Sequence, residues 1–479
     1  MASRRQAPGS FSPQNTSVSH DSAEPAHSVT HLADTSMEQV SASSSTVLQG
    51  YPSEEERSSL MEQLYAKLLD GPRIDILSKL PYEIASYVLH FVDMPNLAKV
   101  ASISKAWNDL TKDNGVWKTV YLHQKQWRIR TPSRKSAPNT AATIDPEQPL
   151  TQQQSGGTGA STAGAVIKAP LDWKELCRNR KALEARWKMT PVDTKLHGHN
   201  DSVYCIQFDN TKIVTGSRDQ TIKFWDFHTL KCTDTLRGHS QSVLCLQFNE
   251  KMMVSGSSDN TIIVWDMETH QPISRLHGHT AGVLDVCFDD QYIISCSKDT
   301  TIKVWDVRTM ALIKTMQGHR GPVNAVQLHQ GQVVSASGDA LVKLWDVATG
   351  VCIRDFIGHE RGLACVQFDG KTIVSGSNDK TIRIWDVATG RCTKVLTGHE
   401  NLVRTLHFDQ NRIVSGSYDY TVKVWDMTTG ECTLDLDKGH VSWVFDVQFS
   451  SSRIISTSQD RNIVVWDFAT PDMDTSMFE

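Results

Sequence analysis

In the C-terminal part of the chain, short runs of apolar side chains alternate with polar residues and are interrupted by turn residues. In the stretch DSVYCIQFDNTKIVTGSRDQTIKFWD (201–226), valine, isoleucine and aromatic residues alternate over short runs. Asp209-Asn210 and Arg218-Asp219 lie between these runs and are typical of tight turns. Alternation with a period of two, bounded by turn residues, predicts β-strands. We therefore predict that this part of the chain consists of short strands joined by turns.

The N-terminal part carries a different pattern, with apolar residues at helical intervals in some segments and almost none in others. Ser53 to Glu56 form a capping-box pattern, and Gly71-Pro72 ends the helix that follows it. Asp172 can cap a later helix. These patterns divide the chain into a disordered tail (1–52), an amphipathic helix (53–71), an all-α domain (72–130), a low-complexity loop (131–170), a linker helix (171–189), a strand-rich repeat region (190–468) and a short tail (469–479).

The repeat region has a nearly fixed period. Seven Gly-His pairs, the first at Gly198, are each followed by Trp-Asp, and each Trp lies 27 residues after its Gly. The interval between repeats is 40 residues five times and then 41. This period and signature resemble WD-repeat proteins and predict a mainly β fold, a seven-bladed propeller with four strands per blade. Residues 190–197 have no blade before them, so we expect them to supply the outer strand of the last blade and close the ring.

The composition argues against several classes of partner and ligand. The net charge of -5 gives no global basic field, so we expect no nucleic-acid partner. No run of about 18 apolar residues suggests a membrane span, and the N-terminus lacks the apolar core of a secretory signal. The ten cysteines are not at zinc-site spacings, so we expect no metal and no cofactor. Free cysteines in this number favour the cytoplasm or the nucleus.

Each repeat contains a His, an Asp, a Ser or Thr and a Trp at equivalent positions. A His–Asp–Ser set suggests a hydrolase, but seven copies cannot all be catalytic triads. These positions resemble the buried hydrogen-bonded tetrad of WD repeats, because buried polar groups need partners. We therefore predict a structural role and a chain that is not itself an enzyme. The positions taken as representative are His199, Asp219, Trp225, His399, Asp419 and Trp425.

Positions that differ between the blades are better indicators of a ligand. Three columns of equivalent positions are informative: the residue before each turn Asp, and the residues five and two after each repeat His. We expect these columns to face the mouth of the channel. The guanidinium group of arginine binds phosphate through two parallel hydrogen bonds. A cationic opening with aromatic residues therefore favours a phosphorylated peptide as the ligand. The residues concerned are Tyr204, Arg218, Lys298, Asn324, Arg361, Arg404 and Tyr418.

Residues 74–121 resemble an F-box, through the Leu80-Pro81 start and through Trp107 and Trp117. An F-box followed by WD repeats is similar to the substrate receptors of Skp–cullin–F-box (SCF) ubiquitin ligases, and strings such as GHERGLACVQF and GHENLVRTLHFDQNRIVSGSYD resemble their beta-transducin-repeat-containing branch. The resemblance implies a top face that binds a doubly phosphorylated D-S-G-x-x-S degron. It maps the contact residues onto Tyr204, Arg218, Ser242, Ser258, Lys298, Asn324, Arg361, Arg404 and Tyr418.

The same resemblance implies partners and leaves alternatives open. It implies a Skp-family adaptor and, through it, a cullin; a segment upstream of the F-box promotes dimerisation in that branch, so a homodimer is one expected state. Ala340, Trp443 and the 131–170 insert depart from the branch pattern. The alternatives are a fungal sulfur-regulation receptor, whose degron need not be phosphorylated, and a propeller scaffold outside any ligase. The expected adaptor-binding residues are Leu77, Leu80, Pro81, Ile84, Val88 and Leu89.

Overall fold

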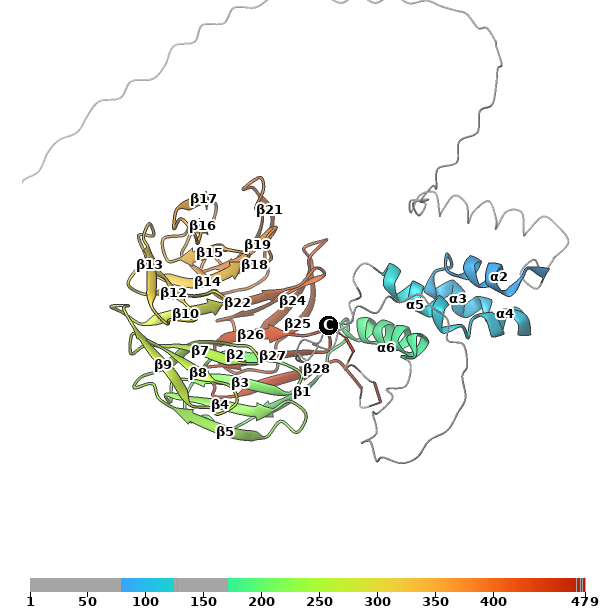
Figure 1. The fold of residues 1–479 in the computed structure, drawn as a ribbon, viewed down its shortest axis with the longest axis horizontal. Helices are drawn as coiled ribbons and strands as arrows, with labels where there is room; N and C mark the ends of the chain where they lie inside the picture. Colours follow the sequence, from blue (N-terminus) through green and yellow to red (C-terminus); the bar gives the residue numbers. More distant parts are fainter. Residues whose placement is uncertain are drawn as a thin grey trace, which may run out of the picture. The chain divides into compact units, whose positions relative to one another are not determined.

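The computed structural model describes residues 79–124, 127, 171–470, 472, 473, 475, 477 and 478, which belong to one compact unit. The predicted disordered tail, the amphipathic helix at 53–71 and the low-complexity loop lie outside the described residues. The described part contains five helices, α2 to α6, followed by 28 strands, β1 to β28 (Figure 1).

Four short helices, α2 to α5, form the N-terminal part of the described chain. The side chains of Asp93, Ser104 and Asp113 each accept a hydrogen bond from a backbone N–H in the first turn of α3, α4 and α5. Such N-caps satisfy amide groups that have no partner within the helix. The bounds are α2 (Tyr82–Leu89), α3 (Met94–Val100), α4 (Lys105–Leu110) and α5 (Asn114–His123).

Helix α6 (Trp173–Arg186) joins these helices to the strands. Its N-cap is Asp172, as predicted, whose carboxylate accepts from the Glu175 N–H at 3.1 Å. Just past its C-terminal end, the Trp187 ring stacks on Phe468 with a centroid distance of 4.0 Å, and the Trp187 indole N–H donates to the Ser451 carbonyl at 2.8 Å. A buried, hydrogen-bonded tryptophan thus fixes the end of α6 to the last sheet.

The strands form seven four-stranded antiparallel sheets, which confirms the predicted seven-bladed propeller. Six sheets take four strands consecutive in the chain, and the seventh has the order β1-β28-β27-β26. The sheets are: β2 (Val203–Phe208), β3 (Lys212–Ser217), β4 (Thr221–Asp226), β5 (Cys232–Arg237); β6 (Val243–Phe248), β7 (Met252–Ser257), β8 (Thr261–Asp266), β9 (Pro272–His277); β10 (Val283–Phe288), β11 (Tyr292–Ser297), β12 (Ile302–Asp306), β13 (Leu312–Met316); β14 (Val323–His329), β15 (Gln332–Ser337), β16 (Val342–Asp346), β17 (Cys352–Phe356); β18 (Leu363–Phe368), β19 (Thr372–Ser377), β20 (Ile382–Asp386), β21 (Cys392–Leu396); β22 (Val403–Phe408), β23 (Arg412–Ser417), β24 (Val422–Asp426), β25 (Cys432–Leu436); and β1 (Val192–Leu196), β28 (Ile463–Asp467), β27 (Arg453–Ser458), β26 (Val444–Phe449).

The ring closes where the last sheet meets the first. Strand β1 pairs with β28 from Val192 opposite Asp467 to Leu196 opposite Ile463, so the residues before the first blade complete the last one, as predicted. Across the same seam, the Asp446 carboxylate accepts from the Ile206 N–H at 2.9 Å. Pairing the first strand into the last sheet removes an open sheet edge and ties the two ends of the ring together.

The innermost strand of every blade carries a β-bulge at the same place. In the first blade the register with β3 shifts between Val203 and Cys205, so Tyr204 has no partner. The other six innermost strands shift at the equivalent position. A bulge interrupts the strict alternation of faces and re-aims side chains. It therefore decides which residues face the centre of the ring.

Candidate functional site

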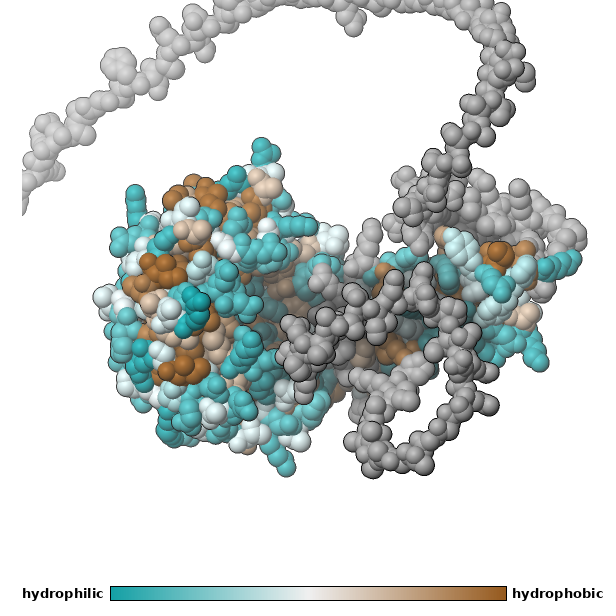
Figure 2. Space-filling view, viewed as in Figure 1, coloured by the Kyte–Doolittle hydropathy of each residue, from teal (hydrophilic) through white to brown (hydrophobic). Residues whose placement is uncertain are grey.

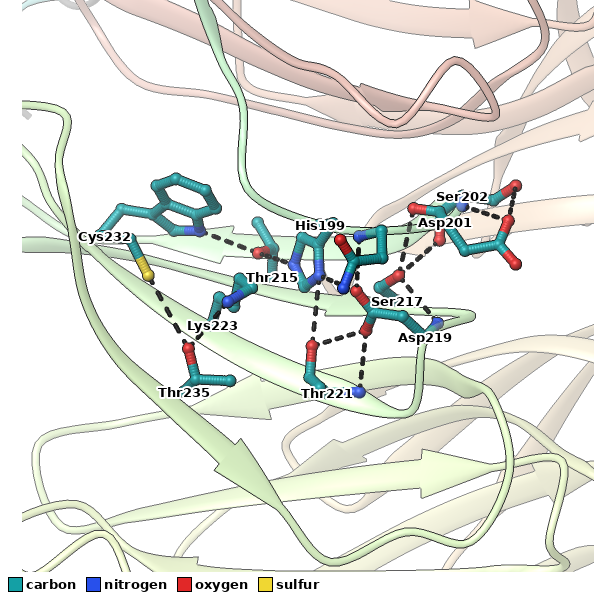
Figure 3. A network of polar contacts seen from close by, with 12 residues as sticks. His199, Asp201, Ser202, Thr215, Ser217, Asp219, Thr221, Lys223, Cys232 and Thr235 are labelled. Atoms are coloured by element: carbon teal, nitrogen blue, oxygen red, sulfur yellow. Dashed lines mark hydrogen bonds and ion pairs between the residues drawn. The ribbon is translucent and has the colours of Figure 1, made fainter.

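The tetrad of each blade is buried and fully hydrogen-bonded. In the first blade, His199 Nδ1 lies 2.9 Å from Asp219 Oδ2 and His199 Nε2 lies 2.9 Å from Thr215 Oγ1 (Figure 3). The Trp225 indole N–H donates to the same hydroxyl at 2.9 Å. Because that hydroxyl accepts from the indole, it can donate to Nε2 of a neutral imidazole, and Nδ1–H then donates to the carboxylate. The network thus joins the start of the blade to β3, β4 and their turn.

The carboxylate of the tetrad is held in its charged form. Burial raises the pKa of Asp219, but hydrogen bonds from His199, Thr221 and the Asn200 N–H outweigh it and hold the pKa well below its usual value. The sixth blade repeats the geometry, with distances of 2.7 Å from His399 to Asp419 and 2.8 Å from Trp425 to Ser415. Its polar atoms are thus paired inside the blade, as buried polar groups require.

The column five residues after each repeat His lies in the central channel. All seven of its members line one cavity: Tyr204, Leu244, Leu284, Asn324, Ala364, Arg404 and Phe445. These are the residues at the seven bulges. Of the residues that the sequence analysis placed at the mouth, Tyr204, Asn324 and Arg404 therefore share one cavity, and Asn324 is held by a 2.6 Å hydrogen bond to the Leu363 carbonyl.

The column six residues after the His also lines the channel, although the sequence pattern alone did not point to it. It brings two carboxylates, Asp285 and Asp446, to the wall of the cavity. Asp285 accepts from the Val326 and Val286 N–H groups, both at 2.9 Å. The surrounding protein raises the pKa of Asp285 to about 7 and that of Asp446 to about 6 by removing water, while nearby Arg404 acts in the opposite sense. Arg404, which lines the same cavity, thus offsets the negative charge of the channel.

Three of the predicted cations are exposed: Arg218 and Lys298 each precede a turn Asp, and Arg361 lies two residues after a repeat His. Arg218 is 58% exposed, and its guanidinium lies 3.7 Å from Asp201. Lys298 and Arg361 are exposed too and form no ion pair with the described part of the chain. An exposed ion pair contributes little to stability, so Arg218 can exchange Asp201 for another anion at small cost. These three side chains can therefore contact an anionic ligand.

Tyr418, Ser242 and Ser258 complete the predicted set. Tyr418 and Arg218 both lie near enough to Tyr204 to act on its pKa, which burial raises. Ser242 and Ser258 come from adjacent loops of the second blade, where the Ser258 N–H donates to the Ser242 carbonyl at 3.0 Å. The structure thus joins Tyr204, Arg218, Arg404 and Tyr418 into one group and places the two serines together in the second blade.

Comparison with known families matches the repeat region. Residues 189–226, 230–266, 270–306, 310–346, 350–386, 390–426 and 430–467 match the family WD40 (WD domain, G-beta repeat), which is more than half of the chain. The chain belongs to the WD40-repeat family. Residues 77–123 match the family described as F-box-like, so this WD40-repeat protein also carries an F-box-like segment before its propeller.

Individual relatives agree with this combination. The chain is 31% identical over 181 residues to a protein of Arthroderma otae named probable E3 ubiquitin ligase complex SCF subunit sconB; the match covers 36% of this chain and 26% of that protein. It is 27% identical over 208 residues to a probable SCF subunit scon-2 of Neurospora crassa, covering 34% and 32%. The matches thus span only about a third or less of these relatives. Among solved structures, a computationally designed protein, Ika8, is 30% identical with a TM-score of 0.50, covering 58% of this chain and all of that one.

The F-box-like segment of this WD40-repeat protein exposes an apolar face on α2. Ile84 is 51% and Val88 39% exposed, and Pro81 is exposed, so these three predicted residues are accessible. Leu80 is half-buried and packs against the core of the helices. Leu89 is fully buried in the core of the helices with Ala85, so its assignment to the adaptor surface is corrected. Leu77 lies outside the described residues.

Sequence reasoning missed two exposed aromatic residues of the same helix. Tyr82 and Tyr87 are each more than half exposed, and the Tyr82 hydroxyl donates to the Asp113 carboxylate at 3.2 Å. Their helical spacing beside Ile84 and Val88 was the available signal. In the described residues no group of three or more His, Cys, Asp or Glu side chains is arranged to hold a metal ion, and no helix is long and apolar enough to cross a membrane.

Proposed function

We propose that this protein is the substrate-recognition subunit of an SCF-type ubiquitin ligase. The observation that carries the proposal is the succession of an F-box-like segment and seven WD40 repeats in one chain. The relatives named as probable SCF subunits support it. In this role the F-box-like helices bind a Skp-family adaptor and through it a cullin, and the propeller binds the protein to be ubiquitinated.

The subunit contributes proximity and no reacting group. Holding a substrate on the propeller raises the local concentration of its lysines near the ubiquitin-conjugating enzyme. The tetrads are consistent with this role, because their polar atoms are hydrogen-bonded to one another within the blades. All ten cysteines are free, which supports a site of action in the cytoplasm or the nucleus, where thiols stay reduced.

The ligand is proposed to be a phosphorylated peptide bound across the channel mouth. A phosphoserine brings about -1.5 to -2 charges at pH 7. Arg218, Lys298 and Arg361 are exposed cations that can pair with it, and Arg404 adds positive charge at the channel. Arg404 also compensates Asp285 and Asp446, so the exposed cations give the cleaner test of ligand binding.

The test is binding of a labelled D-S-G-x-x-S peptide, unphosphorylated and doubly phosphorylated, to the full-length chain. We expect binding of the phosphorylated form alone, weakened roughly tenfold by Lys298→Ala or Arg361→Ala, as for the loss of one hydrogen bond to a charged group. Arg308→Ala is the matched control, because Arg308 is an exposed cation in the β12–β13 turn, at the opposite end of a blade. Equal binding of both peptide forms would contradict phosphate recognition.

A second candidate is a receptor of the fungal sulfur-regulation type, whose degron need not be phosphorylated. The similarity to fungal SCF subunits favours it. Failure of both peptides to bind, while the chain still forms a complex with the adaptor, would select this candidate.

Adaptor binding tests the ligase role separately from the degron. We expect Ile84→Asp to abolish co-purification with a Skp-family adaptor, because it places a charge on the exposed apolar face of α2. Ile353→Asp is the control, since Ile353 is equally exposed on β17 of the propeller. Unchanged co-purification of Ile84→Asp would favour a propeller scaffold outside any ligase.

A further inference from the structure

Four aromatic rings from three adjacent blades form a continuous cluster, and two of them, Tyr204 and Phe445, line the central channel. Tyr418 and Trp443 stack with an angle of 11° between their planes and 4.6 Å between their centroids. Phe445 meets Tyr418 edge-on at 6.0 Å, and Tyr204 lies 4.9 Å from Phe445. We call these four residues the aromatic ridge. It joins the sixth, seventh and first blades.

The most exposed member of the ridge is Trp443. Its side chain stacks on Tyr418, yet the residue remains 39% exposed, and neighbouring Val441 is 76% exposed. Its indole N–H donates no hydrogen bond to the described part of the chain. The equivalent residue of the other blades is never aromatic: Ser202, Ser242, Gly282, Pro322, Gly362 and Leu402. A large ring at this one blade is not required by the repeat and leaves apolar surface facing solvent.

The exposed isoleucines of three outer strands are arranged differently from the ridge. Ile273, Ile313 and Ile353 lie on the outer strands β9, β13 and β17, and each is about half exposed. Figure 2 shows apolar patches over these three strands, separated by hydrophilic surface. Isolated patches of this kind are ordinary on soluble proteins. The ridge differs because its rings are in mutual contact and border the candidate ligand site.

The cations beside the ridge limit what it can bind. Arg404 lines the same cavity as Tyr204 and Phe445. Arg218 and Arg404 also lower the pKa of Tyr204 against the effect of burial, so both act electrostatically at this ring. A ligand cation over the rings would be repelled by these two arginines. An uncharged apolar side chain meets no such penalty, and the anionic part of the same ligand is attracted by them.

We propose that the aromatic ridge is an apolar subsite of the ligand surface, which binds one bulky aromatic or leucine-like side chain of the anionic peptide held by the neighbouring cations. The inference rests on the proposed function, because it assumes a peptide across the channel mouth. Stacked tryptophan and tyrosine rings are the side chains most often found as energetic anchors of protein interfaces. The ligand is therefore an acidic or phosphorylated segment with a large apolar residue in its flank.

The test is a phenylalanine scan of the peptide flanks. The doubly phosphorylated D-S-G-x-x-S core is placed between alanine flanks, and one flanking alanine at a time is replaced by phenylalanine. Binding to the full-length chain is measured by fluorescence anisotropy. We expect one position to strengthen binding roughly tenfold, as for an anchor residue worth about one order of magnitude in affinity. Arginine at that position should give no gain.

Three variants locate the effect. Trp443→Ala should bind the all-alanine peptide nearly as well as the unsubstituted protein but lose the gain from phenylalanine. Trp443→Phe should keep most of the gain, because it keeps an aromatic ring over Tyr418. Ile353→Ala, on the outer strand β17, should keep all of it. Trp443→Phe is also the control for a local structural change that removal of the large ring in Trp443→Ala could cause.

The outcomes separate this inference from the proposed function. If the core peptide binds but phenylalanine helps at no position, or if the gain survives in Trp443→Ala, the subsite is wrong and phosphopeptide recognition stands. A gain from arginine in place of phenylalanine would also overturn the apolar subsite. If the core peptide binds in neither phosphorylation state, phosphopeptide recognition fails and the subsite with it.

Discussion

The tetrads and the channel column show how one repeat serves two purposes. The His at the start of each blade makes the same two side-chain contacts in all seven blades, with distances to Asp between 2.7 and 3.1 Å. Five residues further on, the side chains are Tyr, Leu, Leu, Asn, Ala, Arg and Phe. Identical residues recur where the contact lies within a blade. The variation occurs where side chains face the shared channel, so it is there that a ligand can be distinguished.

Of the variants considered, removal of a tetrad tryptophan should lower the free energy of unfolding most. Trp425 is 1% exposed and its indole N–H is bonded to Ser415. Trp425→Ala leaves a cavity and removes one of the two hydrogen bonds of the Ser415 hydroxyl, which keeps its bond to His399. We expect a loss of about 3–5 kcal/mol in the free energy of unfolding. Denaturant unfolding followed by fluorescence measures it. A loss below about 1 kcal/mol would show that a blade folds without its tetrad, and would contradict the structural role assigned to it.

The half-buried carboxylates of the channel, Asp285 and Asp446, should make stability depend on pH. The pKa of Asp285 is about 7 in the folded protein, against about 3.9 in an unfolded chain. Between these values the folded state binds the extra proton, so the contribution of Asp285 to stability is fully present below about pH 4 and is lost as the pH rises through 7. Asp285→Asn removes this titration and should flatten the profile by on the order of 2–4 kcal/mol between pH 4 and pH 8.

Asp290→Asn is the control for this titration, because Asp290 is exposed in the adjacent turn. Thermal unfolding across the pH range compares the two variants with the unsubstituted protein. Parallel profiles for all three proteins would show that water in the channel solvates Asp285 and that its carboxyl titrates normally.

The sequence predicted the blades better than the channel, for a physical reason. Strand alternation and the fixed Gly-His to Trp-Asp spacing are local, so strands, turns and ring closure could be predicted from them. The bulge at Tyr204 is not visible in that alternation. It lets two consecutive columns line the cavity. Asp285 and Asp446 belong to the second of these columns, which carries cysteine in three other blades, and strict alternation would turn it away from the channel.

The adaptor face shows a second limit of sequence reasoning. Helix α2 is apolar on more than one side, since Ala85 and Leu89 are buried while Ile84 and Val88 are exposed. Residues four apart share a face of a helix, but spacing alone does not say which of two apolar stripes packs inward. Only the contacts of α2 with its neighbours place Leu89 in the core.

Replacement of Gly362 should lower the free energy of unfolding by an intermediate amount. Gly362 belongs to a column that varies between blades, yet a Cβ there would lie 2.9 Å from the Gly338 carbonyl oxygen of the preceding blade. Gly362→Val should therefore cost about 1–3 kcal/mol, the range for overpacking against a rigid neighbour. Denaturant unfolding checks this, with Ser242→Val at the equivalent position of the second blade as the control. Equal costs would show that the fourth and fifth blades are no tighter than the rest.

Lys298→Ala should change the stability of the protein least. The same substitution should clearly weaken phosphopeptide binding. Its side chain is exposed in a turn and forms no ion pair with the described residues, so Lys298→Ala should change the free energy of unfolding by less than about 0.5 kcal/mol. The same variant should weaken phosphopeptide binding, and more so at low salt, because the interaction is between exposed charges. Binding measured at two ionic strengths beside denaturant unfolding tests both parts. If Lys298→Ala lowered stability as much as binding, the varied positions would be part of the fold after all, and the division between tetrad and mouth would not hold.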